Sequence, residues 1–165
     1  MKPFLRALGT TAAGAWLGGM ILIAIVAQTT FSEIRKTDVA QPNAIAGRVM
    51  AKNFSRFDSV QWICVGVLVA TQVGRMGMGD RTRGEWVRLF MIAAAGGLFA
   101  FSALVMTPRI LGLQETVAGE NAEVAVKAAF DSFHETSVRI AKVNLVLVLA
   151  IVMSLAMGRP AEATA

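Results

Sequence analysis

Four long apolar stretches dominate this chain of 165 residues. They cover residues 7–30, 57–77, 86–107 and 137–157, and a helix of about 20 mostly apolar residues is long enough to cross the hydrocarbon core of a bilayer. Backbone N–H and C=O groups in lipid must bond to each other, which favours helices for such spans. The sequence therefore predicts an all-α fold, a polytopic membrane four-helix bundle that forms a single domain over residues 1–165.

The composition agrees with a membrane protein. Hydrophobic residues make up 55% and charged residues 16% of the chain, whereas a soluble domain carries about a quarter charged residues. The net charge of +5 comes from Lys and Arg in loops and at span ends, where they contact lipid headgroups. We therefore expect the lipid bilayer as partner and no nucleic acid, with a homo-oligomer or a larger membrane complex as further alternatives.

Basic residues also predict the orientation of the chain. The first apolar stretch is too long for a signal-peptide core and three more spans follow, so we expect it to be retained. Positive charges are densest near the N-terminus and in the short second loop. We expect a multi-pass protein of the bacterial inner (plasma) membrane with both termini in the cytoplasm. The basic residues concerned are Lys2, Arg6, Arg75, Arg81, Arg83 and Arg88.

The first and third loops are long and the second is short, which predicts two helical hairpins. In the first loop Arg48, Lys52 and Arg56 recur every four positions with apolar residues on the other faces, as in an amphipathic helix that lies in the membrane interface over residues 44–57. Pro108 is expected to end the third span. A second interfacial helix is expected over residues 120–133.

The two hairpins resemble copies of each other. The pair Gly18 and Gly19 aligns with Gly96 and Gly97, and Asp58 aligns with His134. A parallel repeat would place Asp58 and His134 at equivalent points on one side of the bundle. The alternative is that two apolar helices with glycine pairs match by chance.

The fourth span begins with many polar residues, which divide between two helical faces. Glu135, Arg139 and Lys142 share one face, where they serve as an interfacial anchor or, alternatively, line an ion path. The other face is the better candidate for the bundle interior. With Asp58 it defines a candidate polar site, which consists of Asp58, His134, Ser137 and Asn144.

Small and amide residues in the other spans predict helix packing. One stripe of the second span carries Gln61, Cys64, Leu68, Gln72 and Arg75, and one side of the first carries Thr10, Gly14, Ala24 and Gln28. Small residues allow helix backbones to approach closely, and amides form hydrogen bonds between helices. The helix-packing residues are expected to be Gly14, Gly18, Gly19, Gly96 and Gly97.

No motif indicates an enzyme or a cofactor. The chain lacks a Walker loop, a dinucleotide fingerprint, an H-E-x-x-H motif and a nucleophile elbow. His134, with Asp58, Met50 or Met106, offers ligands that suit copper(I), but the residues have no clustered ligand spacing. We expect no catalytic residue, no metal and no cofactor.

Three segments resemble one family of small membrane proteins. They are LGGMILIAIVAQTTF, AGRVMAKNFSRFDSVQW and FDSFHETSVRIAKVNLVLVL, and the strongest matches are Phe130-x-x-x-His134 and the pair Gly18 and Gly19. The family is the domain-of-unknown-function family 4149, similar to transmembrane protein 205. It often has a proline near the end of the first span, where this chain has Gln28 and Thr29. A distant similarity to copper-resistance membrane proteins of the D type implies transport or metal handling, without any established catalytic residue.

These observations leave three hypotheses for function. The first is an uncharacterised multi-pass membrane protein that is transporter-like or handles a small solute or ion. The second is a structural subunit that packs in a larger membrane complex through its glycine faces. The third is a copper- or haem-binding membrane protein.

Overall fold

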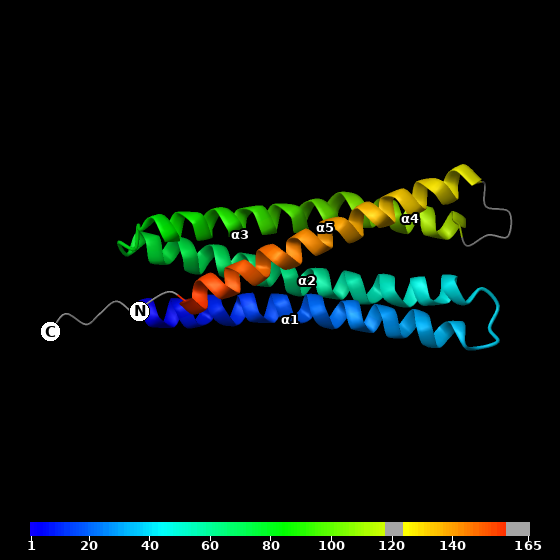
Figure 1. The fold of residues 1–165 in the computed structure, drawn as a ribbon, viewed down its shortest axis with the longest axis horizontal. Coiled ribbons are helices and arrows are strands. Elements are labelled where there is room, and N and C mark those ends of the chain that lie inside the picture. Colours follow the sequence, from blue (N-terminus) through cyan, green and yellow to red (C-terminus); the bar gives the residue numbers. More distant parts are fainter. Residues whose placement is uncertain (118–123, 158–165) are drawn as a thin grey trace.

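The structure is a computed structural model and describes residues 1–117 and 124–157. The described residues form helices and no strand (Figure 1). Four helical rods in this structure are long and apolar enough to cross a membrane, as the sequence predicts. Three of the rods are single helices, and the third along the chain is the continuous helical path Arg83–Gln114. The elements are α1 (Lys2–Arg35), α2 (Pro42–Gly77), α3 (Arg83–Phe101), the π-helical segment η1 (Ser102–Met106), α4 (Thr107–Val117) and α5 (Val124–Met157).

Helices α1 and α2 lie antiparallel and side by side along their whole length (Figure 1). Near the N-terminus a Cβ at Gly9 would lie 3.0 Å from Oγ1 of Thr71. At the far end, Nε of Arg35 donates a hydrogen bond of 2.9 Å to Asn43. The start of α1 therefore lies beside the end of α2, and the end of α1 lies beside the start of α2.

The apolar core lies in the half of the bundle where α5 ends beside the beginning of α1 (Figure 1). The indole of Trp16 is fully buried and meets the ring of Phe99 edge to face, with the ring centroids 6.3 Å apart. All four helical rods contribute to this core. Its buried members are Ala12, Ala13, Trp16, Cys64, Leu68, Ile92, Ala95, Phe99, Val148, Ile151 and Leu155.

The two interfacial helices expected in the long loops are not separate elements. Residues 44–57 form the first half of the continuous helix α2. Of the second segment, residues 120–123 lie outside the described residues, and residues 124–133 begin the continuous helix α5. The periodicity predicted helix correctly, but nothing between the amphipathic and apolar halves ends either helix.

The expectation that Pro108 ends the third span is also wrong. The helical path continues from α3 through η1 into α4, where Pro108 is the second residue. Proline cannot donate a hydrogen bond to the preceding turn, and its ring collides with a carbonyl there. The backbone adapts in η1, where the N–H of Thr107 donates to the carbonyl of Ser102 in a wider, π-helical turn.

Candidate functional site

Asp58 is the end of a chain of hydrogen bonds that begins in the core. Nε1 of Trp16 donates to Oε1 of Gln61 over 2.7 Å, and both side chains are buried. Nε2 of Gln61 donates in turn to Oδ1 of Asp58 over 3.3 Å. Asp58 is half-buried, so this chain links α1 to α2 and leads from the bundle centre towards its surface.

The other three residues of the candidate polar site have different surroundings. His134 is exposed and stacks on Phe130 with ring centroids 5.9 Å apart. Ser137 is half-buried. Asn144 is buried, and its Oδ1 accepts no hydrogen bond from any described group.

Within the described residues, no hydrogen bond or ion pair joins Asp58 to His134, Ser137 or Asn144. That the four residues form one polar site therefore stays a prediction. The expected interior face of the fourth span needs correction, since of these α5 residues only Asn144 is buried. The charged face is as expected: Arg139 and Glu135 form an exposed ion pair of 2.7 Å.

The expected packing face was correct for the second span and wrong for the first. Gln61, Cys64, Leu68 and Gln72 are all buried along α2. In α1, by contrast, Gly14, Ala24 and Gln28 are exposed. The buried residues of α1 are Gly9, Ala12, Ala13 and Trp16, so the core is faced by another side of the helix, on which small residues accompany the large Trp16 indole.

The five glycines expected at helix contacts fall into two groups. A Cβ at Gly19 would overlap the ring of Phe57, and a Cβ at Gly96 would lie 3.1 Å from Val65. These two positions allow neighbouring helices to approach closely. A Cβ at Gly14, Gly18 or Gly97 would meet nothing within 4 Å, so none of these three packs against another helix of this chain.

Sequence reasoning missed a buried cluster of charged side chains around Glu85. The Glu85 carboxylate accepts hydrogen bonds of 2.7 Å from Arg75 and Arg88 and one of 2.8 Å from the Gln72 amide. Arg88 also donates through Nε and Nη2 to the side chain and carbonyl of Ser154. The cluster therefore ties α2, α3 and α5 together at one end of the bundle.

An exposed ion pair extends this cluster to α1. Nζ of Lys2 donates to Oδ1 of Asp80 over 2.7 Å, and Nε of Arg75 lies 3.7 Å from Oδ2 of the same carboxylate. The hydrogen bond from Lys2 is the largest cause that lowers the pKa of Asp80, which lies in the turn between α2 and α3. We call this region the paired end, which consists of Lys2, Gln72, Arg75, Asp80, Glu85, Arg88 and Ser154.

A local signal for the paired end is present in the sequence. In Thr82-Arg83-Gly84-Glu85 the Thr82 hydroxyl accepts from the N–H of Glu85 over 3.4 Å, as a helix N-cap does. This cap starts α3 and places Glu85 in its first turn, one turn before Arg88. The motif thus predicts the start of α3 and the position of Glu85 in its first turn.

The donors for a metal ion do not converge in the part of the chain that the structure describes. No group of three or more His, Cys, Asp and Glu side chains lies close enough there to hold an ion. The cysteine Cys64 is buried in the core.

The fold defines the class of protein: four apolar helical rods make this a multi-pass helical membrane protein. A family model described as domain of unknown function (DUF4149) matches residues 11–118, and the chain belongs to this family. Neither the search of curated proteins nor the search of solved structures gave a match.

Proposed function

We propose that this protein is a non-enzymatic structural subunit that packs in a larger membrane complex through one face of α1. The observation that carries the proposal is the open space at Gly14 and Gly18, where an added Cβ would meet nothing within 4 Å. The two glycines are four residues apart and therefore lie on the same side of the helix. Both are exposed.

The surroundings of these glycines support the proposal. Thr11 and Ala15 are also exposed, so the face of small residues extends over two turns of α1. In lipid, helices associate through van der Waals packing, and small residues at this spacing allow another helix to approach closely. Helix α1 already has α2 and α5 as neighbours, which leaves this face for a partner outside the chain.

Cross-linking in native membranes tests the proposal. We expect the wild-type chain to give a discrete cross-linked complex, and the double variant Gly14→Leu with Gly18→Leu to lose it while retaining its fold. Gly66→Leu is the matched control, because Gly66 is equally open but lies on α2. A wild-type chain that stays monomeric in native membranes, or equal loss of the complex in the control, would contradict the proposal.

The handling of a small solute or ion is a second candidate function, favoured by the buried acceptor Oδ1 of Asn144 that lacks a described partner. A buried polar atom without a hydrogen-bond partner lowers the stability of the fold by about 1–3 kcal/mol. A bound ion or solute that contacts this atom would offset the cost. Proteoliposomes loaded with H⁺, Na⁺ or K⁺ test this candidate. It predicts an ion flux that falls at least tenfold in Asn144→Leu, whereas no flux in the wild type would exclude these ions.

We also propose the bacterial inner membrane as the location, with both termini in the cytoplasm. Lys2 and Arg6 at the start of α1, with the basic residues of the turn between α2 and α3, support this orientation. Labelling of single cysteines introduced in that turn and in the turn between α1 and α2 tests it. Only the second position should react with a membrane-impermeant thiol reagent added to intact cells.

A further inference from the structure

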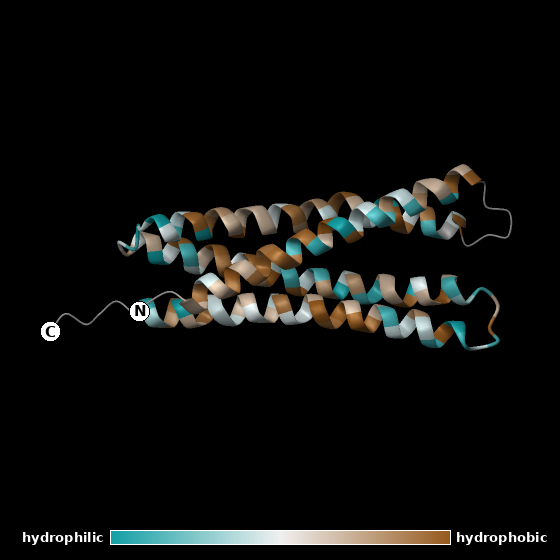
Figure 2. Cartoon of the chain, in the orientation of Figure 1, coloured by the Kyte–Doolittle hydropathy of each residue, from teal (hydrophilic) through white to brown (hydrophobic). Residues whose placement is uncertain are grey.

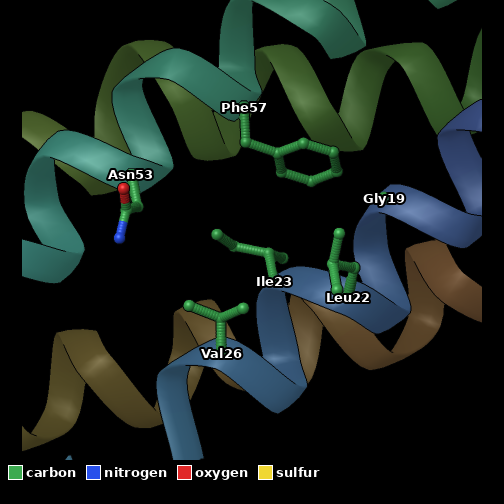
Figure 3. A pocket seen from close by; sticks show the side chains of 6 residues that line it. All are labelled: Gly19, Leu22, Ile23, Val26, Asn53 and Phe57. Carbon is green, nitrogen blue, oxygen red and sulfur yellow. The ribbon is translucent and has the colours of Figure 1, made fainter. Parts of the chain in front are cut away.

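An apolar groove of about 220 Å³ lies between α1 and α2. Leu22, Ile23 and Val26 project from α1 towards α2, where Phe57 and Asn53 face them (Figure 3). Gly19 also lines the groove, and its missing side chain makes room for the Phe57 ring. The groove is open on one side, so a ligand can enter it laterally.

The groove lies where α2 leaves the apolar layer before α1 does. The uncharged run of α2, residues 59–74, is about 24 Å long at 1.5 Å per residue, and that of α1, residues 7–32, is about 39 Å. The hydrocarbon core of a bilayer is about 30 Å thick. Figure 2 shows α1 still hydrophobic beside the first half of α2, which carries hydrophilic residues.

Three basic residues lie on this half of α2, at different angles from the groove. Arg48, Lys52 and Arg56 are exposed, and none forms a hydrogen bond or ion pair with a side chain that the structure describes. At about 100° per residue, Arg56 lies about 60°, Lys52 about 100° and Arg48 about 140° around the helix from Asn53. Arg56 is therefore the basic residue nearest the groove, Lys52 follows on the same flank, and Arg48 lies towards the opposite side of the helix. We call this region, residues 44–58 of α2 with Gly19–Val26 of α1, the open end.

Arg48, Lys52 and Arg56 lie beyond the uncharged run of α2, where this helix leaves the apolar layer. At that level long basic side chains extend into the headgroup layer, where lipid phosphates are present. Asn53 adds a polar group inside the groove, where the only acceptor of its Nδ2 among the described groups is the Met50 sulfur, 4.0 Å away. An anion at the rim of the groove satisfies this amide together with the nearest basic side chains, Arg56 and Lys52.

We propose that the open end binds an anionic phospholipid. One acyl chain occupies the groove, and the phosphate lies against Lys52, Arg56 and the amide of Asn53. The groove is smaller than the 300–1,000 Å³ of ordinary small-molecule sites, and it opens to the side, as a portion of one lipid tail requires. Basic side chains near a membrane surface attract anionic headgroups, so Lys52 and Arg56 favour an anionic lipid over a zwitterionic one.

Native mass spectrometry of the purified full chain tests the proposal, with phosphatidylglycerol and phosphatidylcholine of identical acyl chains as probes. We expect the wild type to retain phosphatidylglycerol at least tenfold better than phosphatidylcholine. The triple variant Arg48→Gln, Lys52→Gln and Arg56→Gln should lose this preference. All three side chains are exposed, so the fold should persist.

Two further variants separate a built site from general attraction. Lys127, Arg139 and Lys142 on α5 are also exposed, and their replacement by Gln removes the same charge while leaving the groove intact. This control should keep the preference for phosphatidylglycerol. Val26→Phe fills the groove without changing the charge, and it should weaken retention of phosphatidylglycerol at least fivefold.

Three results would overturn the proposal. Equal retention of the two lipids by the wild type would show that binding does not depend on the charge of the headgroup. Equal loss in the α5 control would show that only net charge matters. Displacement of the lipid by an excess of glycerol phosphate would show a site for free phosphate, without a role for the acyl chain.

Discussion

The two ends of the bundle treat their charged residues in opposite ways. At the paired end, Arg75, Glu85 and Arg88 are almost completely shielded and bind each other and Ser154. At the open end, Arg48, Lys52 and Arg56 lie on the surface with no partner among the described side chains. Both ends carry similar residue types, so composition alone does not distinguish them.

This contrast separates the end where the chain binds itself from the end where its charged side chains are available to other molecules. Charges that connect three helices fix the relative positions of those helices, and the apolar core continues from them. No residue of α1 beyond Met20 is buried. On α2, by contrast, the open end does pack internally, because Ala46 and Met50 are buried. Its exposed basic side chains take no part in that packing and are available to a lipid.

Replacement of the central carboxylate should have the largest effect. Glu85→Gln leaves Arg75 and Arg88 without their shared counter-charge, and removal of one member of a buried pair costs about 3–5 kcal/mol. Unfolding by SDS in mixed micelles measures the change. Glu135→Gln is the matched control, because it breaks the exposed pair with Arg139 and should cost less than about 0.5 kcal/mol. Equal costs would contradict the distinction between buried and exposed pairs.

Truncation of core side chains should have the next largest effect. Ile151 is fully buried, and Ile151→Ala should lower the free energy of unfolding by about 2–3 kcal/mol through lost contacts and a cavity. Ile23 lines the open groove and is half-buried. Ile23→Ala should cost less than half as much in the same SDS titration. A larger cost at Ile23 would mean that the open end is as closely packed as the core.

The smallest effect is expected at Asp80. Its pKa is lowered chiefly by Lys2, so the unfolded chain binds more protons than the folded one in the acid range. The stabilisation is therefore complete above the ordinary pKa of about 3.9 and is lost as the pH falls through the lower folded-state pKa. Asp80→Asn should cost less than about 1 kcal/mol at neutral pH, because Lys2 is half-exposed. Between pH 6 and pH 3, the free energy of unfolding should depend less on pH in this variant than in the wild type. The same pH dependence in both would show that Asp80 does not contribute to acid destabilisation.

The sequence predicted the class of fold and one packing face. Long apolar runs dictate helices in lipid, and the spacing of Gln61, Cys64, Leu68 and Gln72 correctly indicated the buried stripe of α2. Periodicity also identified the pair of Glu135 and Arg139. These features depend on neighbours within one helix, which a single sequence reveals.

The remaining features depend on contacts between helices. The order of charges along the chain does not reveal that Arg88 of α3 reaches Ser154 of α5. Which glycines face a neighbouring helix depends on how each helix is rotated about its own axis. Gly19 packs against Phe57, whereas Gly18 beside it is open. The packing face of α1 was predicted wrongly because small residues occur on two sides of this helix. The buried side is the one that also carries Trp16.

Hydrogen–deuterium exchange of the full chain in nanodiscs tests the contrast between the two ends most directly. In phosphatidylcholine alone, we predict faster exchange of the backbone amides over residues 46–57 of α2 than over residues 66–76. Addition of phosphatidylglycerol should slow exchange over residues 46–57 and leave residues 66–76 unchanged. Equal protection of both segments, with no response to the anionic lipid, would contradict the account.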